Sequence, residues 1–101
     1  MTSTHDDAIY KALASPLRRS ILYWLKDVSA NFPSVDVAPG RGVPATAIHR
    51  RSGLSQSAVS THLAILLRAR LVTAHKTGTW VLFRRNEAAI DAFLGDLRCR
   101  L

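Results

Sequence analysis

Cysteine is almost absent from this sequence of 101 residues, and Cys99 is its single thiol. One thiol cannot close an intrachain disulfide or supply the thiolate cluster of a zinc site. Long apolar runs are missing too, because no stretch reaches the ~18 residues of a membrane span, and residues 1–7 do not resemble a secretory signal. A chain of this length forms one domain. We therefore expect a single cytoplasmic domain over residues 1–101 that makes no membrane contact.

Carboxylates are missing from the middle half of the chain. Residues 37–86 carry eight Arg and Lys side chains and no Asp or Glu, and the whole chain has a net charge of +7. Such a segment suits a polyanionic partner, since each phosphate contact releases counterions and no acid repels the phosphates. A basic surface kept for solubility is the alternative, but solubility does not require that acids be excluded from so long a segment.

The order of the predicted elements is that of a small, mainly helical domain. Ser15 and Pro16, a hydroxyl cap followed by proline in the first turn, start the second helix. Ser55 and Asn86 are the caps expected for the helices that follow them. Residues 29–43 hold two prolines and two glycines without periodicity, and predict an extended loop. The runs 71–76 and 80–85 flank a glycine turn and predict a β-hairpin. Helices are expected over 6–14, 16–28, 44–51, 56–69 and from 87 onward, so the order is α-α-α-α-β-β-α.

Residues 44–69 have the form of a helix-turn-helix, with a short helix, a glycine turn and a longer second helix. On the second helix, Val59, Leu63 and Leu66 predict a buried face. The opposite side carries Ser57, Thr61, Ala64 and Arg68, flanked by Gln56 and Ser60. Short side chains let a helix approach a DNA groove, hydroxyls and amides meet base edges, and arginine meets phosphate or guanine. An ordinary solvated face is the alternative, but it would favour Glu and Lys, and this helix has neither.

Three runs, ALASPLRRSILYWL, GLSQSAVSTHLAILLRARLV and WVLFR, resemble the ArsR/SmtB winged helix-turn-helix repressors in sequence and in order. The resemblance covers residues 8–97. It implies a homodimer formed by the first and last helices, which binds an inverted-repeat operator in double-stranded DNA. It also implies that the helix 56–69 lies in the major groove, that the hairpin lies near the DNA backbone, and that an inducer relieves repression.

The residue chemistry and the resemblance together predict a DNA-binding site and no catalytic site. The residues expected to contact DNA are Arg50, Gln56, Ser57, Ser60, Thr61, His62, Arg68, Lys76, Thr77 and Thr79. For His62, structural packing and a phosphate contact both remain open. The alternative function is a winged helix that contacts protein or RNA without operator specificity. An enzyme is disfavoured, because the sequence shows no nucleophile–base pair or paired carboxylates at useful spacing.

The sequence departs from the family pattern at three places. Arg70 stands where members usually have glycine, which costs about 1 kcal/mol if the residue is left-handed. The loop 29–43 is longer than usual. The metal ligands are missing, since residues 43–46 hold no cysteine and residues 87–101 hold no histidine. We therefore expect no metal and no cofactor, and any inducer should be a small organic molecule or an oxidant of Cys99.

The last helix and the loop bear on the dimer and the inducer. The last helix carries a stripe of large apolar residues, Ile90, Leu94, Leu97 and Leu101, and opposite it a stripe of small ones, Ala88, Ala92, Gly95 and Cys99. A helix that is apolar on two sides packs against its own domain and a second subunit. Cys99 is then a small interface residue or a redox site. Near the loop, Trp24 and Phe32 fit core packing or the wall of a small-molecule pocket. The alternative to a pocket there is that the loop 29–43 has no binding role and that the repressor responds to no inducer.

Overall fold

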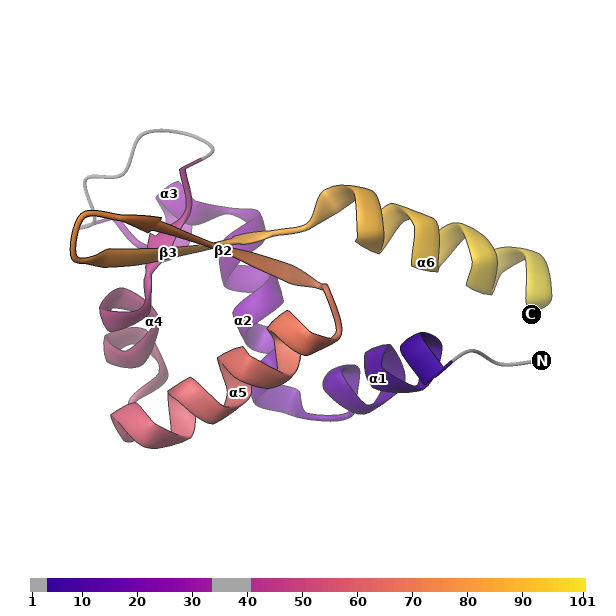
Figure 1. The fold of residues 1–101 in the computed structure, drawn as a ribbon, viewed down its shortest axis with the longest axis horizontal. Coiled ribbons are helices and arrows are strands. Elements are labelled where there is room, and N and C mark those ends of the chain that lie inside the picture. The colour runs from indigo at the N-terminus through magenta and orange to yellow at the C-terminus, as the bar shows by residue number, and fades with distance from the viewer. Residues whose placement is uncertain (1–3, 34–40) are drawn as a thin grey trace.

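The computed structural model describes residues 4–33 and 41–101, and it confirms a mainly helical winged-helix fold with a small antiparallel sheet. In Figure 1 the helix-turn-helix and the hairpin form the body of the domain, and the first and last helices extend from one end of it. The hairpin strands pair with each other, and a short strand joins the outer edge of the second, giving the order β1-β3-β2. The elements are α1 (Thr4–Leu13), α2 (Pro16–Lys26), α3 (Val28–Asn31), β1 (Val43–Pro44), α4 (Ala45–Ser52), α5 (Gln56–Arg68), β2 (Val72–Thr77), β3 (Trp80–Arg85) and α6 (Glu87–Arg100).

Side-chain caps mark the starts of α2, α3, α5 and α6, and the caps at Ser15, Ser55 and Asn86 are those that the sequence predicts. The Ser15 hydroxyl accepts a hydrogen bond from the Arg18 N–H at 3.3 Å, and the Ser55 hydroxyl accepts one from the Ala58 N–H at 3.2 Å. Asn86 caps α6 in the same way. Each cap of this kind stabilises its helix by ~1 kcal/mol. The cap at Ser55 fixes the first turn of α5, and with it which side chains of that helix face outward.

The predicted loop over residues 29–43 is wrong at both of its described ends. At the first end Asp27 caps the one-turn helix α3, and the ring of Phe32 is buried. At the second end Val43 pairs with Phe83 and begins β1. The short helix α3 depends on one cap, and β1 depends on a pairing between residues far apart in the chain. Neither leaves a periodic pattern in the local sequence, so periodicity does not predict them. The remaining residues of the predicted loop, 34–40, lie outside the described residues.

The core joins α2, α4, α5 and the sheet. In α5 the buried residues are Val59, Leu63 and Leu66, which confirms the predicted inward stripe. Burying a side chain of this size contributes ~1.5–3 kcal/mol. The core thus fixes the rotation of α5 about its axis and leaves its other face to solvent. The largest fully buried side chains come from every part of the body: Ile21, Val43, Ile48, Val59, Leu66, Leu71 and Val72.

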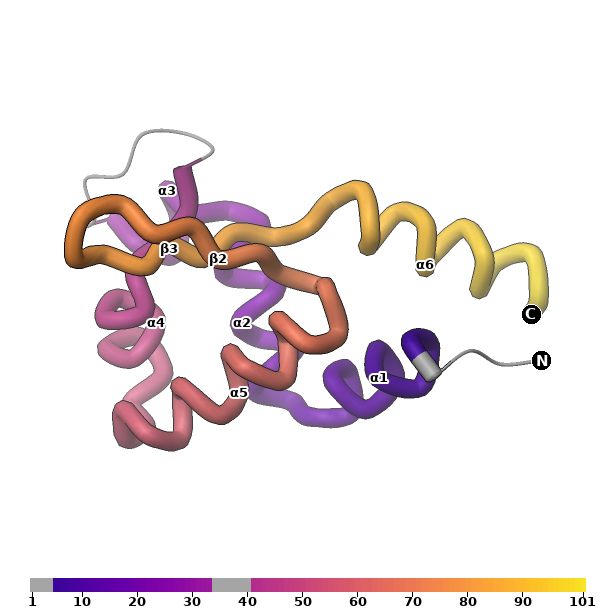
Figure 2. The backbone as a smooth tube through the Cα atoms, in the orientation of Figure 1, coloured from indigo at the N-terminus to yellow at the C-terminus, as the bar shows by residue number. Residues whose placement is uncertain are grey.

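Helices α1 and α6 lie side by side and form a projection that we call the arm (Figures 1 and 2). The contact between them is an edge-on pair of aromatic rings, Tyr10 and Phe93, whose centroids lie 5.5 Å apart at 70°. Such pairs contribute ~0.5–1.5 kcal/mol beyond the area that they bury. Phe93 is the buried residue of α6.

The stripe of large apolar residues predicted for α6 is exposed at two of its four positions. Leu94 is 53% exposed and Leu101 is 97% exposed. Phe93 takes the inward position instead, with the half-buried Ile90 and Leu97 on the same side. The spacing of these three residues is also helical, so the sequence pattern allowed both faces, and the aromatic contact with α1 decides between them. The arm therefore keeps exposed apolar side chains.

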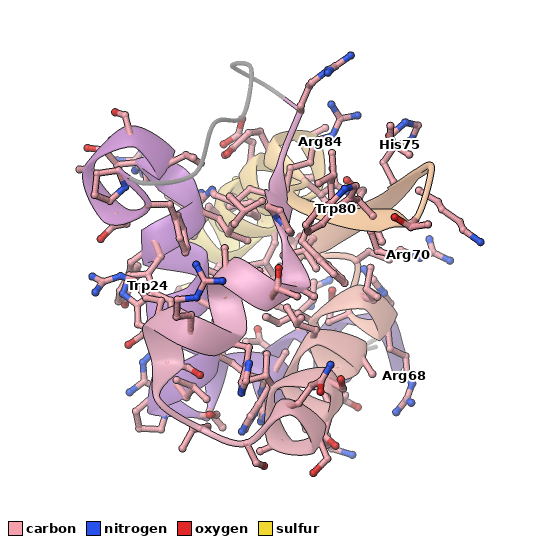
Figure 3. All side chains as sticks on the ribbon, turned by 90° about the vertical axis from the view of Figure 1, so that its left-hand side faces the viewer. Trp24, Arg68, Arg70, His75, Trp80 and Arg84 are labelled. Carbon is pink, nitrogen blue, oxygen red and sulfur yellow. The ribbon has the colours of Figure 1, made fainter. Side chains whose placement is uncertain are left out.

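Arg70 has the left-handed conformation that its position in the sequence suggested, with φ at 62°. The chain reverses there, and the Leu71 N–H donates to the Leu66 carbonyl at 3.1 Å. Arginine costs about 1 kcal/mol relative to glycine in this conformation. In Figure 3 Arg70 lies along the same side of the molecule as Arg68 and His75. The left-handed residue thus adds a cation to that side.

Candidate nucleic-acid interface

The turn between α4 and α5 has a fixed geometry. Gly53 ends α4 with a positive φ of 72°, a conformation that glycine adopts without steric cost. The Ser52 hydroxyl donates to the His49 carbonyl at 2.8 Å and accepts from the Leu54 N–H at 3.1 Å. These bonds tie the end of α4 to the turn. The segment is a helix-turn-helix.

The outward face of α5 is polar and carries no carboxylate. Thr61 Oγ1 donates to the Ser57 carbonyl at 3.0 Å, which leaves the hydroxyl lone pairs available as acceptors. Arg68 ends the face with a guanidinium. Short side chains on this face let the helix approach a partner closely, while hydroxyl and amide groups offer donors and acceptors. All six residues predicted to face outward are exposed: Gln56, Ser57, Ser60, Thr61, Ala64 and Arg68.

His62 is the one predicted site residue of α5 that is not fully exposed. Its ring is half-buried, and its Nδ1 lies 3.0 Å from Nη1 of Arg18. Burial, and after it the positive charge of Arg18, lowers the pKa of His62. A histidine that stays neutral is a poor phosphate ligand, because phosphate contacts rely on positive charge. Of the two roles that the sequence left open, the structure favours packing.

The hairpin of β2 and β3, which we call the wing, presents a cation, two hydroxyls and an aromatic ring. Lys76, Thr77 and Thr79 are all exposed near its tip. Lys76 lies opposite Val81 and Thr77 lies opposite Trp80, so the two pairs point to opposite faces of the hairpin. Trp80 is 54% exposed and is not among the predicted site residues. Strand alternation was the signal that could have found it.

The two arginines that end α4 have different surroundings. Arg50 is exposed. The guanidinium of Arg51 lies 4.9 Å from the centroid of the Trp24 ring, and its Nη2 donates to Asn31 Oδ1 at 3.0 Å. A cation over an aromatic face is a stabilising contact. Arg51 is also exposed, but its guanidinium is held by Trp24 and Asn31, so Arg50 is the better placed of the two to meet a partner.

The remaining predictions concern metal, redox and membrane chemistry. In residues 4–33 and 41–101 no three His, Cys, Asp or Glu side chains come together in a way that could hold a metal ion. Cys99 is exposed on α6, within the arm. None of the helices in these two ranges is long and apolar enough to cross a bilayer. The groups that do gather on the outside of α5 and the wing are those of a surface that binds a polyanion.

Comparisons with known proteins agree with this geometry. A family model described as "Bacterial regulatory protein, arsR family" matches residues 48–74, from α4 into the wing. The HTH-type transcriptional regulator YbzH of Bacillus subtilis (strain 168), itself uncharacterized, is 36% identical over 95 residues, which cover 92% of this chain and 95% of that protein.

Solved structures give the same result for the fold. HlyU from Vibrio cholerae is 30% identical with a TM-score of 0.63, covering 94% of this chain and 92% of its own. The cadmium metal-sensor CMTR from Mycobacterium tuberculosis is 30% identical with a TM-score of 0.57, covering 90% and 81%. An ArsR family transcriptional regulator with 19% identity and a TM-score of 0.68, covering 97% and 91%, shares the fold.

The matches extend over nearly the whole chain, from the arm to the wing. The relatives are transcriptional regulators and not enzymes, so the enzyme alternative is set aside. The resemblance expected from the three sequence runs is confirmed. This chain belongs to the ArsR family of bacterial transcriptional regulators.

Proposed function

We propose that this protein is a homodimeric transcription repressor that binds an inverted repeat in double-stranded DNA, with α5 as the recognition helix in the major groove. The observation that carries the proposal is the outward face of α5, which consists of short polar side chains and ends in Arg68. Such a face can approach base edges closely. The acid-free segment 37–86 supplies the phosphate attraction that all DNA binding needs.

The exposed residues divide into two roles. Gln56, Ser57, Ser60 and Thr61 occupy the N-terminal half of α5, and we assign them to base edges. Cations and hydroxyls at the end of α5, on α4 and on the wing are suited to the sugar–phosphate backbone, whose contacts fix orientation without reading sequence. We assign Arg50, Arg68, Lys76, Thr77 and Thr79 to that role.

The arm supplies the dimer interface in this proposal. Tyr10, Leu94 and Leu101 are large apolar side chains that a single subunit leaves exposed. A small domain gains from covering such groups with a second copy, and a two-fold axis makes the same patch meet itself. Two recognition helices related in this way bind half-sites about one helical turn, ~34 Å, apart. We expect the protein to act in the cytoplasm, where its DNA target lies.

Alanine substitutions test the division of roles. Gln56→Ala, Ser57→Ala and Thr61→Ala are expected to relax sequence preference, at a cost of about 1–3 kcal/mol for a good base contact. Arg50→Ala and Lys76→Ala are expected to weaken binding to all duplexes and to reduce the salt slope by about one. Anisotropy titrations of a preferred and a scrambled duplex at several salt concentrations measure both effects. A Lys76 variant with altered preference, beside α5 variants with none, would show the groove assignment to be wrong.

We also propose that the signal releasing the DNA is not a metal ion. One thiol per chain gives a dimer at most two sulfurs, whereas thiophilic metals select thiolate clusters. Helix α6 offers Glu87, Asp91 and Asp96 but no imidazole for a zinc site. A small organic inducer, or oxidation of Cys99 across the interface, is the alternative signal. Zinc and cadmium are expected to leave the DNA bound, and release at micromolar metal would refute this. A Cys99→Ser protein that still responds to oxidant would remove the redox route.

A further inference from the structure

Arginines from α2 close the C-terminal end of α1, which has no glycine cap. Arg18 Nε donates to the Ala12 carbonyl at 2.9 Å, and its Nη2 donates to the Lys11 carbonyl at 3.0 Å. Arg19 Nη1 donates to the Leu13 carbonyl at 2.7 Å. The last carbonyls of a helix lack partners within the helix. These bonds give donors to the Ala12 and Leu13 carbonyls and a second donor to the Lys11 carbonyl, which also accepts from the Ala14 N–H at 3.2 Å. The two side chains fasten α1 to the start of α2.

The third nitrogen of the Arg18 guanidinium reaches α5. Its Nη1 lies 3.0 Å from Nδ1 of His62. A guanidinium is permanently protonated and can only donate, so Nδ1 must accept. The His62 ring is then neutral and carries its proton on Nε2. One planar group thus joins three helices, with α2 as its carrier and with acceptors on α1 and α5.

We propose that Arg18 is a positioning residue that holds the recognition helix α5 against the end of α1 through neutral His62, and that protonation of His62 breaks this link and weakens DNA binding. The inference rests on the function proposed for α5. Through this link acid can weaken DNA binding even though the His62 ring itself does not contact the DNA. Because α1 is half of the arm, the same link connects the dimer interface to the helix that reads the operator.

The charges around His62 oppose its protonation. Arg18 contacts the ring, and a protonated imidazole would place a second positive charge 3.0 Å from a guanidinium that keeps its own. Burial and this charge already lower the pKa of His62. On α5 itself the other charged group is Arg68. Most other titratable groups on the elements packed against α5 are basic: His5, Asp6, Asp7, Tyr10 and Lys11 on α1, Arg19, Tyr23 and Lys26 on α2, His49, Arg50 and Arg51 on α4, and His75 and Lys76 on β2.

A phosphate contact by His62 predicts the opposite pH effect. If the ring met the DNA backbone, protonation would add a cation and acid would strengthen binding. In the positioning role only the neutral ring accepts from Arg18, so acid weakens binding. The affinity for DNA is expected to fall about tenfold for each unit by which breaking the link raises the pKa of His62. The sign of the effect due to His62 therefore separates the two roles.

The experiment compares the intact protein with His62→Gln, because glutamine retains an acceptor oxygen and does not titrate in this range. A labelled duplex, enriched from random DNA by the protein itself, is titrated between pH about 7.5 and about 5.5, where histidine titrates. The ratio of wild-type to His62→Gln affinity is expected to fall as the pH falls. His5→Gln removes a histidine on α1 that is not part of the link, and this control should keep the wild-type acid response.

Two results would overturn the inference. An identical acid response in wild type and His62→Gln would show that the ring does not control binding. Wild type that tightens in acid relative to the variant would restore the phosphate contact. Arg18→Lys gives an independent readout, since an ammonium keeps the charge but lacks the fork that joins two carbonyls and a ring. It should also lose the wild-type acid response, and an unchanged response there would contradict the link.

Absence of DNA binding at neutral pH would refute the proposed function but not the contact between Arg18 and His62. Unfolding measurements then test that contact independently. The pKa of His62 is lower in the folded protein than in the unfolded chain, so the unfolded chain binds more protons in acid. The contribution of His62 to stability is therefore complete above the ordinary histidine pKa of about 6.5 and is lost as the pH falls below it. His62→Gln should remove that decline, and a variant that declines as wild type does would refute the link.

Discussion

A Leu94→Asp protein is expected to be monomeric and to bind the inverted repeat about a hundredfold or more weaker than wild type. Leu94 is an exposed apolar residue of the arm, where the second subunit is proposed to pack. An unpaired carboxylate in an apolar contact costs several kcal/mol, which is enough to separate the subunits. Separate monomers no longer engage two half-sites as one ligand. Light scattering measures the mass of the protein, and duplex titration measures its affinity.

Tyr23→Asp is the matched control for this substitution. Tyr23 is 63% exposed on α2, outside the arm, so the change adds the same charge to another exposed apolar residue. This variant is expected to remain dimeric and to bind DNA. A Leu94→Asp protein that stays dimeric would show that the arm is not the interface. A monomer that binds the repeat as tightly as wild type would show that dimerisation is not needed.

Thr61→Glu is expected to weaken binding to every duplex severely. Thr61 lies in the middle of the outward face of α5, in the segment that carries no acid. A carboxylate there faces phosphates and base acceptors, and such a like-charge contact costs several kcal/mol, or about a hundredfold or more in affinity. The longer side chain also holds the helix away from the groove. Titrations with preferred and scrambled duplexes measure the loss.

Two controls accompany Thr61→Glu. Ala30→Glu adds the same charge to an exposed residue of α3, which lies at the opposite end of the body from α5 in Figure 1, and it should bind DNA nearly as wild type does. Thr61→Ala removes the hydroxyl without adding charge and should lose preference more than affinity for DNA in general. If the glutamate and alanine variants behave alike, α5 does not lie in the groove.

The local features of this fold could be predicted from the sequence because their signals lie within one turn or one helix. Ser15 and Ser55 are caps next to helical periodicity, and both accept the expected hydrogen bonds. The helical spacing of Val59, Leu63 and Leu66 fixes which side of α5 is buried. For the candidate site this was sufficient to place the outward face, because a helix with a buried stripe has one opposite side.

The features that the sequence did not predict depend on contacts between distant residues. Strand β1 forms because Val43 pairs with Phe83 of β3. The inward face of α6 is chosen by the ring of Tyr10, which lies near the other end of the chain. The link from Arg18 to His62 joins residues of different helices, and only their meeting makes the histidine a neutral acceptor. Composition and periodicity contain no record of such pairs.

Selection of duplexes from a random pool by the purified protein, followed by sequencing, tests sequence-specific binding by a dimer most directly. The expected product is an inverted repeat with half-sites about one helical turn, ~34 Å, apart, bound by two chains. Affinity for that duplex is expected to fall steeply as salt rises, because the basic segment releases counterions from the phosphates. A pool without an enriched palindrome, or an affinity that does not change with salt, would contradict the proposed repressor function.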